Sequence, residues 1–112
     1  MELKTEDFYI WYDEASNTTH FQGKLRLNNT EEYEPINRLL EKASSDKPLV
    51  IWNLKQLEFL NSSGINVLYK FVLTARKNNL QMRVLGSEGM NWQKKSLPNM
   101  KKFLPTIELI IE

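Results

Sequence analysis

The chain has 112 residues, of which 41% are hydrophobic and 26% charged, and this size and composition predict one globular domain spanning residues 1–112. Its 15 basic and 14 acidic residues leave a formal net charge of +1, which excludes a strong overall field for nucleic acid or membrane surfaces. The absence of cysteine excludes disulfides, thiol catalysis and thiolate metal sites, and no apolar run approaches the length of a membrane span. Because the first residues also contain no apolar targeting segment, we expect a cytoplasmic protein.

The N-terminal part of the chain predicts a β-hairpin followed by a helix. Residues 8–12 are rich in aromatic and β-branched side chains, and apolar residues alternate with polar ones over residues 21–27. Apolar residues then recur at helical spacing until the polar residues 44–47. Because proline is tolerated mainly near a helix start, Pro35 indicates that this helix begins around Glu34.

The middle of the chain predicts a central strand and a second helix. Residues 49–54 form a nearly continuous apolar run, which is typical of a strand covered on both faces. After a polar turn, four apolar residues share one side of a helix that ends at residues 76–79. These four residues, which we expect to face the sheet, are Ile65, Leu68, Val72 and Ala75.

The C-terminal part predicts a strand, an interrupted helix and a last strand. Residues 82–85 form the first of these strands, Pro98 interrupts the helix, and residues 107–111 form the last strand. The complete order is β-β-α-β-α-β-α-β. Strands that alternate with helices indicate an α/β protein with a mixed β-sheet and right-handed crossover helices.

The titratable residues form no recognisable catalytic or metal-binding arrangement. His20 is the only histidine, so a serine nucleophile cannot be paired with a histidine base in the usual way. The one dense group of carboxylates, Glu31, Glu32 and Glu34, lies beside a helix start, where negative charge is favourable in any case. Neither of the glycine-rich nucleotide-binding motifs occurs. We therefore expect no enzyme, no bound metal and no cofactor.

Two lysine pairs raise the question of a charged surface. Lys94-Lys95 and Lys101-Lys102 are seven residues apart, a spacing that would place both pairs on one side of an uninterrupted helix. Since we expect Pro98 to interrupt that helix, we interpret the lysines as a solvated surface, with a docking patch for an acidic partner as the alternative. Trp92 is interpreted as a core or near-core residue, with an exposed anchor as the alternative.

The turn Asn61-Ser62-Ser63-Gly64 lies between the central strand and the second helix. Asn61, Ser62 or Ser63 can cap the helix, a role that contributes about 1 kcal/mol, and taken alone this role would explain the turn. Gly64 would also allow the backbone of another molecule to approach closely. We therefore expect an arginine at position 64 to weaken partner binding while stability stays nearly unchanged.

Residues 49–86 resemble the core of the STAS family, which includes the anti-sigma-factor antagonists of bacterial partner-switching systems. That family has an apolar strand, a short link, an Asp-Ser-Ser/Thr-Gly turn, an apolar helix and a strand that ends near a glycine. The turn is matched by Asn61-Ser62-Ser63-Gly64, and weaker similarity extends to Gly23-Lys24-Leu25 and to residues 97–105. Three carboxylates common in the family are replaced here, by Arg26, Asn53 and Asn61.

The resemblance implies the STAS fold and a regulatory, non-enzymatic function. In that family the serine after the aspartate is phosphorylated by a partner serine kinase, and the matching residue here is Ser62, with Ser63 as the second candidate. A cognate serine/threonine kinase and an opposing phosphatase are therefore the implied partners. The implied partner-binding residues are Asn61, Ser62, Ser63, Gly64 and Asn66. The alternatives are an unmodified scaffold that binds a protein or a small ligand, and a small enzyme.

Overall fold

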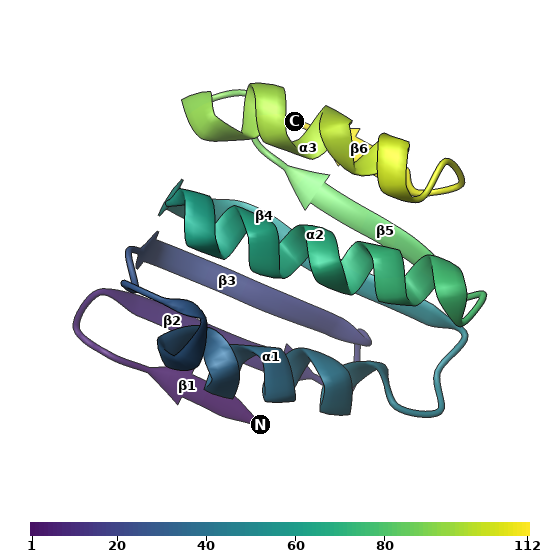
Figure 1. The fold of residues 1–112 in the computed structure, drawn as a ribbon, viewed down its shortest axis with the longest axis horizontal. Helices are drawn as coiled ribbons and strands as arrows, with labels where there is room; N and C mark the ends of the chain where they lie inside the picture. Colours follow the sequence, from purple (N-terminus) through teal and green to yellow (C-terminus); the bar gives the residue numbers. More distant parts are fainter.

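The computed structural model describes the whole chain, Met1–Glu112, as a six-stranded sheet with helices packed on it (Figure 1). The elements in chain order are β1 (Glu2–Lys4), β2 (Phe8–Asp13), β3 (Thr18–Leu25), α1 (Thr30–Ser44), β4 (Leu49–Leu60), α2 (Ser62–Lys77), β5 (Gln81–Gly86), α3 (Asn91–Phe103) and β6 (Glu108–Ile111). The predicted α/β class with a mixed sheet is confirmed. The predicted order lacks only β1, whose 3 residues are too few for a recognisable pattern and form a strand because β2 offers a free edge.

The strands lie side by side in the order in which they occur in the chain. β1, β2 and β3 pair antiparallel, whereas β3, β4, β5 and β6 pair parallel, with one helix between each parallel pair. Every crossover thus advances to the next strand in the same direction. Right-handed crossovers of this kind place their helices on one face of the sheet, and Figure 1 shows α1, α2 and α3 on the same side.

Strand β4, in the middle of the sheet, contacts helices with one face only. Val50, Trp52 and Leu54 are buried, whereas the alternate residues Ile51 and Asn53 are only half-buried. The expectation that this strand is covered on both faces is therefore wrong, because no crossover helix passes over the opposite face. The strand is also twice as long as predicted, with 12 residues in place of six.

Helix α1 begins at Thr30, four residues before the predicted start. The Glu32 backbone N–H donates to the Asn29 side chain over 2.9 Å, and the Glu32 carboxylate accepts from the Asn28 N–H over 2.8 Å. These two hydrogen bonds stabilise an additional first turn, in the manner of a capping box. Pro35 consequently lies inside the helix, on its exposed side.

Helix α3 is continuous from Asn91 to Phe103 although it contains Pro98, so the predicted interruption is wrong. Leu97 and Met100, on either side of the proline, are 0% and 1% exposed. Their packing against the sheet offsets the helical hydrogen bond that proline cannot make. Both lysine pairs therefore lie on a single uninterrupted helix.

Helix α2 lies in the middle of the helical layer and packs against both α1 and α3. Leu68, Val72 and Ala75 are buried, as predicted. Ile65 is only half-buried, although it still touches the core. The buried side of the helix is completed by three further residues, Gly64, Val67 and Phe71. The opposite side of α2 is left free to meet other molecules.

We expect Leu68→Ala to lower the free energy of unfolding by about 2 to 5 kcal/mol, because truncation leaves a cavity where the side chain is now 2% exposed. Leu73, on the same helix, is 46% exposed, and Leu73→Ala should change that free energy by less than about 0.5 kcal/mol. Urea denaturation of the two variants measures the difference. Similar small losses for both would contradict the burial of Leu68.

Candidate functional site at the start of helix α2

The turn that resembles the STAS motif connects β4 to α2 through a single residue, Asn61. Because β4 is parallel to both of its neighbours, this connection lies at the carboxyl edge of the parallel strands. Open α/β sheets usually carry their binding sites at this edge. The Asn61 backbone N–H donates to the Leu25 carbonyl over 3.2 Å, which holds the turn against the end of β3.

The side chain of Asn61 connects three segments of the chain. Its amide oxygen accepts hydrogen bonds from the Gly64 N–H over 3.0 Å and from the Tyr33 hydroxyl over 2.6 Å. Its amide nitrogen donates to the Leu27 carbonyl over 2.8 Å. Of the three residues that could cap α2, Asn61 is the one that does so, and it also ties the helix to α1 and to the loop after β3.

This arrangement explains why an asparagine stands where the STAS turn has an aspartate. The contact with the Leu27 carbonyl requires a donor, which the amide nitrogen of Asn61 supplies. A carboxylate has acceptors only, so it would bring two oxygen atoms into repulsive contact. An amide at position 61 therefore fits this turn better than a carboxylate would.

Tyr33 is the second member of this network and is 1% exposed. Burial raises the pKa of the Tyr33 hydroxyl above its ordinary value, a hydrogen bond with the Leu27 backbone lowers it in part, and the nearby Glu32 charge raises it further. The hydroxyl therefore stays protonated at neutral pH. It remains a hydrogen-bond donor to Asn61 throughout the physiological pH range.

The two serines of the turn are not used for capping. Ser62 is the first residue of α2 and is exposed, whereas Ser63 is half-buried. Asn61 alone supplies the cap, and neither serine hydroxyl forms a hydrogen bond with another group of the protein. The first turn of α2 contains no acidic residue. A negatively charged group on Ser62 would therefore meet the favourable field and the free N–H groups of a helix start.

Gly64 is buried, and internal packing determines its identity. A Cβ atom at this position would lie 2.3 Å from Leu60 Cδ1 and 2.7 Å from the Tyr33 hydroxyl oxygen. The residue thus faces the interior, and the expectation that an arginine here would leave stability nearly unchanged is wrong. Gly64 contributes to the site indirectly, by allowing the start of α2 to lie close to β4 and α1.

Asn66 and Phe59 are two further exposed residues close to Ser62 in the chain. Asn66 is exposed one turn after Ser62 on the same side of α2. Phe59, near the end of β4, is 41% exposed, and the guanidinium of Arg26 lies 5.4 Å from the centre of its ring. Phe59 was not predicted as a surface residue. Burial stops alternating in this part of β4, where Leu57 is buried and Phe59, two residues later, is exposed, so no period-two pattern could have identified it.

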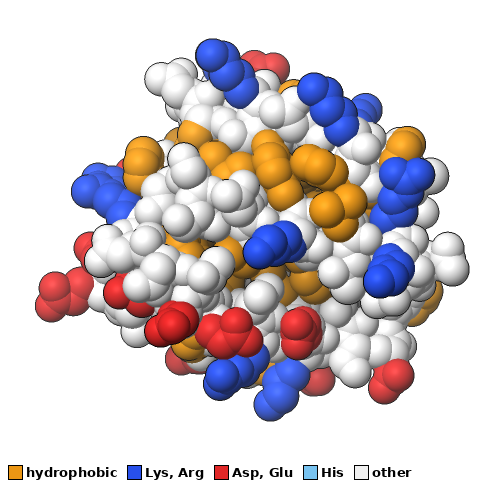
Figure 2. All heavy atoms as spheres, in the orientation of Figure 1, with side chains coloured by type: hydrophobic (Ala, Val, Ile, Leu, Met, Phe, Trp, Pro, Cys, Tyr) orange, Lys and Arg blue, Asp and Glu red, His pale blue; other side chains and the backbone are white.

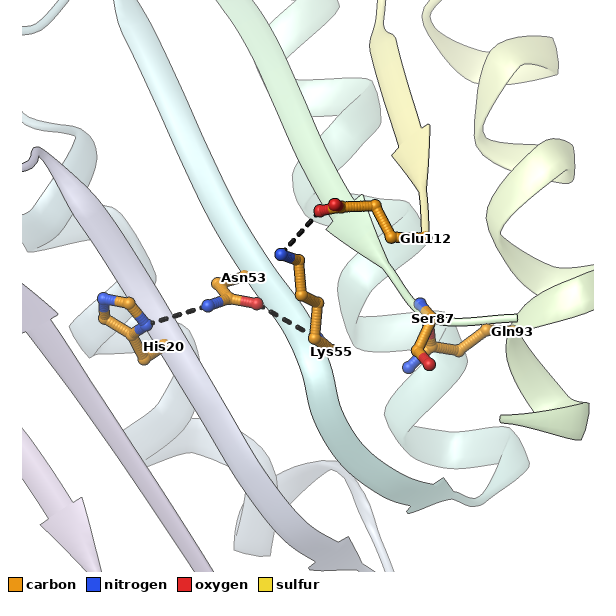
Figure 3. A network of polar contacts seen from close by, with 6 residues as sticks. All are labelled: His20, Asn53, Lys55, Ser87, Gln93 and Glu112. Atoms are coloured by element: carbon orange, nitrogen blue, oxygen red, sulfur yellow. Dashed lines mark hydrogen bonds and ion pairs between the residues drawn. The ribbon is translucent and has the colours of Figure 1, made fainter. Parts of the chain in front are cut away.

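A second polar group lies on the open face of the sheet (Figure 3). The Asn53 side-chain nitrogen lies 3.1 Å from a ring nitrogen of His20, and Lys55 forms an ion pair with Glu112 at 2.6 Å. His20 also stacks on Trp11, with 4.8 Å between the ring centres. Asn53 and His20, which the sequence left unassigned, therefore contribute to the packing of this sheet face.

Gln93 of α3 is fully buried, and no pattern in the sequence distinguishes it from a surface glutamine. Its side-chain nitrogen donates to the Leu54 carbonyl over 2.6 Å, and its oxygen accepts from the Ser87 N–H over 2.8 Å. The neighbouring Trp92 is half-buried and donates its indole N–H to the Leu57 carbonyl over 2.7 Å. These bonds lie where the register between β3 and β4 shifts, so α3 satisfies carbonyl groups of the irregular strand.

Other features of the surface give no sign of a second site near the turn. No group of three or more His, Asp or Glu side chains could hold a metal ion. Two hollows of about 670 and 480 Å³ lie between the C-terminal ends of α1 and α2 and beside the turn between β1 and β2. No helix has the length and apolar character needed to cross a membrane.

No protein-family model and no curated protein matches this sequence. The fold, however, is similar to that of a chain in the crystal structure of the diguanylate cyclase SiaD in complex with its activator SiaC from Pseudomonas aeruginosa. The TM-score is 0.72 at 13% identity, over 100% of this chain and 99% of that chain. SiaC of Pseudomonas aeruginosa gives a TM-score of 0.69 at 15% identity, over 100% of this chain and 98% of that chain. This chain therefore has the same fold as SiaC.

We expect Gly64→Ala to lower the free energy of unfolding by about 1 to 3 kcal/mol, because the new methyl group would overlap Leu60 and Tyr33. Gly89→Ala is the matched control, since a Cβ there meets only the Ser87 hydroxyl oxygen at 3.5 Å. Thermal and urea denaturation of both variants measure the effect. A Gly64 variant as stable as the Gly89 variant would show that the site is less tightly packed.

We also expect Asn61→Asp to lower the free energy of unfolding by about 1 to 3 kcal/mol, because the Leu27 carbonyl would lose its donor and face a carboxylate. Asn66→Asp makes the same chemical change at an exposed position of α2 and should have little effect. Denaturation at neutral pH compares the two variants. Equal stability would contradict the need for an amide in the turn.

Proposed function

We propose that this protein is a non-enzymatic partner-switching regulator of the STAS type, a single cytoplasmic domain controlled by phosphorylation of Ser62. One observation carries the proposal. Ser62 presents an exposed hydroxyl without a hydrogen bond at the first turn of α2, while Asn61 alone caps that helix. Since the fold does not need the Ser62 hydroxyl, its modification can change the surface without unfolding the domain.

A serine/threonine kinase would transfer the γ-phosphoryl group of its own ATP to the Ser62 oxygen, ADP would leave, and the hydroxyl proton would pass to a base of the kinase. This reaction depends mainly on alignment, and a rigid first turn of a helix provides a fixed acceptor. The phosphate adds a charge of about −1.5 to −2 at neutral pH. An opposing phosphatase would hydrolyse the phosphoserine and restore the free hydroxyl.

The surface that changes on phosphorylation is formed by Ser62, Asn66 and the exposed part of Ser63, supported from inside by Asn61 and Gly64. We propose that a partner protein binds this surface when Ser62 is free and leaves it when Ser62 carries phosphate. The similarity of the fold to SiaC, described as the activator of a diguanylate cyclase, supports a protein partner. It also makes a diguanylate cyclase the first partner to test.

Protein isolated from its native cell should carry a single phosphate on Ser62 in part of the population, as measured by mass spectrometry of the peptide that contains the turn. Ser62→Ala should abolish the modification without loss of stability, because the hydroxyl is exposed and forms no hydrogen bond within the protein. Ser63→Ala is the matched control and should leave the modification in place. Phosphate on neither serine under any growth condition, with Ser62→Ala cells behaving as wild type, would leave the unmodified scaffold as the function.

A diguanylate cyclase from the same cell provides the second test. The unmodified protein should bind it and change its rate of cyclic di-GMP synthesis, and Ser62→Asp should weaken both effects. The aspartate supplies only part of the charge of a phosphate, so a partial loss is expected. Binding that is equal for wild type and for Ser62→Asp would contradict control at this position.

A further inference from the structure

The helical layer has a strongly uneven charge distribution that the net charge of +1 conceals. Helix α1 carries four glutamates against two basic residues, whereas α2 and α3 contain no acidic residue at all. Figure 2 shows the acidic side chains mainly in the lower part of this view, over α1, and the basic ones mainly over α2 and α3. We call the exposed surface of α2 and α3 the basic face. Its seven basic residues are Lys70, Arg76, Lys77, Lys94, Lys95, Lys101 and Lys102.

The charges of the basic face are not neutralised within the protein. All seven side chains are exposed. The ion pairs of the structure are Arg38–Glu34, Lys55–Glu112 and Arg83–Glu108, and none of them includes a residue of the basic face. These cations can therefore form ion pairs with an acidic partner without breaking internal pairs.

A strip of apolar side chains runs through the basic face, where α2 meets α3. The rings of Tyr69 and Phe103 lie 4.9 Å apart, and the Tyr69 hydroxyl donates to the Ser96 carbonyl over 2.8 Å. Leu73 follows Tyr69 by one turn and is 46% exposed, which makes it the most exposed large apolar residue of the two helices. We call Tyr69, Leu73 and Phe103 the apolar strip.

The uninterrupted course of α3 brings two of its lysines beside this strip. Ser96 and Phe103 face α2, as their contacts with Tyr69 show. Lys95 and Lys102 precede these two residues and, at 100° per residue, lie on the outward side of α3 next to the strip. Lys94 and Lys101 point instead to the side that is turned away from α2.

We propose that the basic face binds an acidic amphipathic helix of a partner protein. Lys95 and Lys102 beside the strip require acidic residues, and the exposed Leu73 requires an apolar stripe next to them. The strip also follows two neighbouring helices, so a third helix can lie along it. A lipid surface fits less well, because Leu73 is the one large apolar side chain of the two helices that is more than a third exposed.

This surface is continuous with Ser62. Leu73 follows Ser62 by 11 residues, which is close to three full turns, so both lie on the same side of α2 about 16 Å apart along its axis. A phosphate on Ser62 would therefore place negative charge along the path of an acidic helix and repel it. This link rests on the proposed phosphorylation of Ser62, whereas the binding of an acidic helix does not.

A synthetic peptide of about 20 residues, long enough to be helical, provides the test. It contains glutamate and alanine, with leucine at every third or fourth position, and a second peptide has the same composition with leucines distributed around the helix. Fluorescence anisotropy at physiological salt should show binding of the first peptide and much weaker binding of the second. Lys95→Glu combined with Lys102→Glu should weaken binding about tenfold or more.

Lys94→Glu combined with Lys101→Glu is the matched control, because it changes the charge of the same helix by the same amount on the other side. It should weaken binding by less than about threefold, since salt screens charges beyond about 8 Å. Leu73→Asn should weaken binding without a change in charge. Circular dichroism verifies that each variant remains folded.

Four outcomes would overturn the proposal. Equal binding of the two peptides, or equal effects of the two lysine pairs, would mean attraction by charge alone. Binding to phosphatidylglycerol vesicles without binding to the amphipathic peptide would make the face a membrane contact. If neither the amphipathic peptide nor the vesicles bind, the basic face is not a binding site.

The experiments distinguish failure of helix binding by the basic face from failure of the phosphorylation switch. Ser62 phosphorylated in cells with no peptide binding would contradict the basic face alone. Peptide binding with Ser62 never phosphorylated would contradict the switch alone. If both hold, protein phosphorylated at Ser62 should bind the peptide more weakly than unmodified protein, and added salt should reduce that difference.

Discussion

The amide side chain of Asn61 is the interaction on which the candidate site depends. This planar group accepts hydrogen bonds from Tyr33 and Gly64 and donates one to the Leu27 carbonyl. It therefore holds together the start of α2, the helix α1 and the loop after β3. Each partner is held in turn by its burial: Tyr33 is 1% exposed, and Gly64 has no room for a methyl group. A displacement of any one of them would leave a partly buried polar group with one hydrogen bond fewer, which is costly.

Because the Asn61 side chain caps α2, the hydroxyl of the adjacent Ser62 has no structural role. A hydroxyl that neither caps nor packs can be modified at little cost to the fold, while its rigid surroundings keep it in one position. The right-handed crossovers determine which side of α2 is accessible. They place α2 between α1 and α3 on a single face of the sheet, so the outward side of α2 is the one side on which Ser62, Asn66 and Leu73 can meet another protein.

The features that the sequence predicted correctly are those with a strong local period. The stripe containing Leu68, Val72 and Ala75 and the alternation of strands with helices follow from repeats within a few residues. The errors arose where distant contacts overruled a local rule. Pro98 stays within a helix because buried Leu97 and Met100 hold both of its sides, and the short strand β1 exists only through its pairing with β2.

For the candidate site, the sequence by itself determined the turn Asn61-Ser62-Ser63-Gly64, its place between a strand and a helix, and the identity of the hydroxyls that it offers. Tertiary structure decided which residue caps the helix, that Gly64 faces inward, and that the basic residues of α2 and α3 form one surface. The physical reason is the separation of the interacting groups along the chain. Turn and helix signals come from neighbouring residues, whereas the Asn61 side chain meets Tyr33 and Leu27 across 28 and 34 residues, and only folding brings such groups within hydrogen-bonding distance.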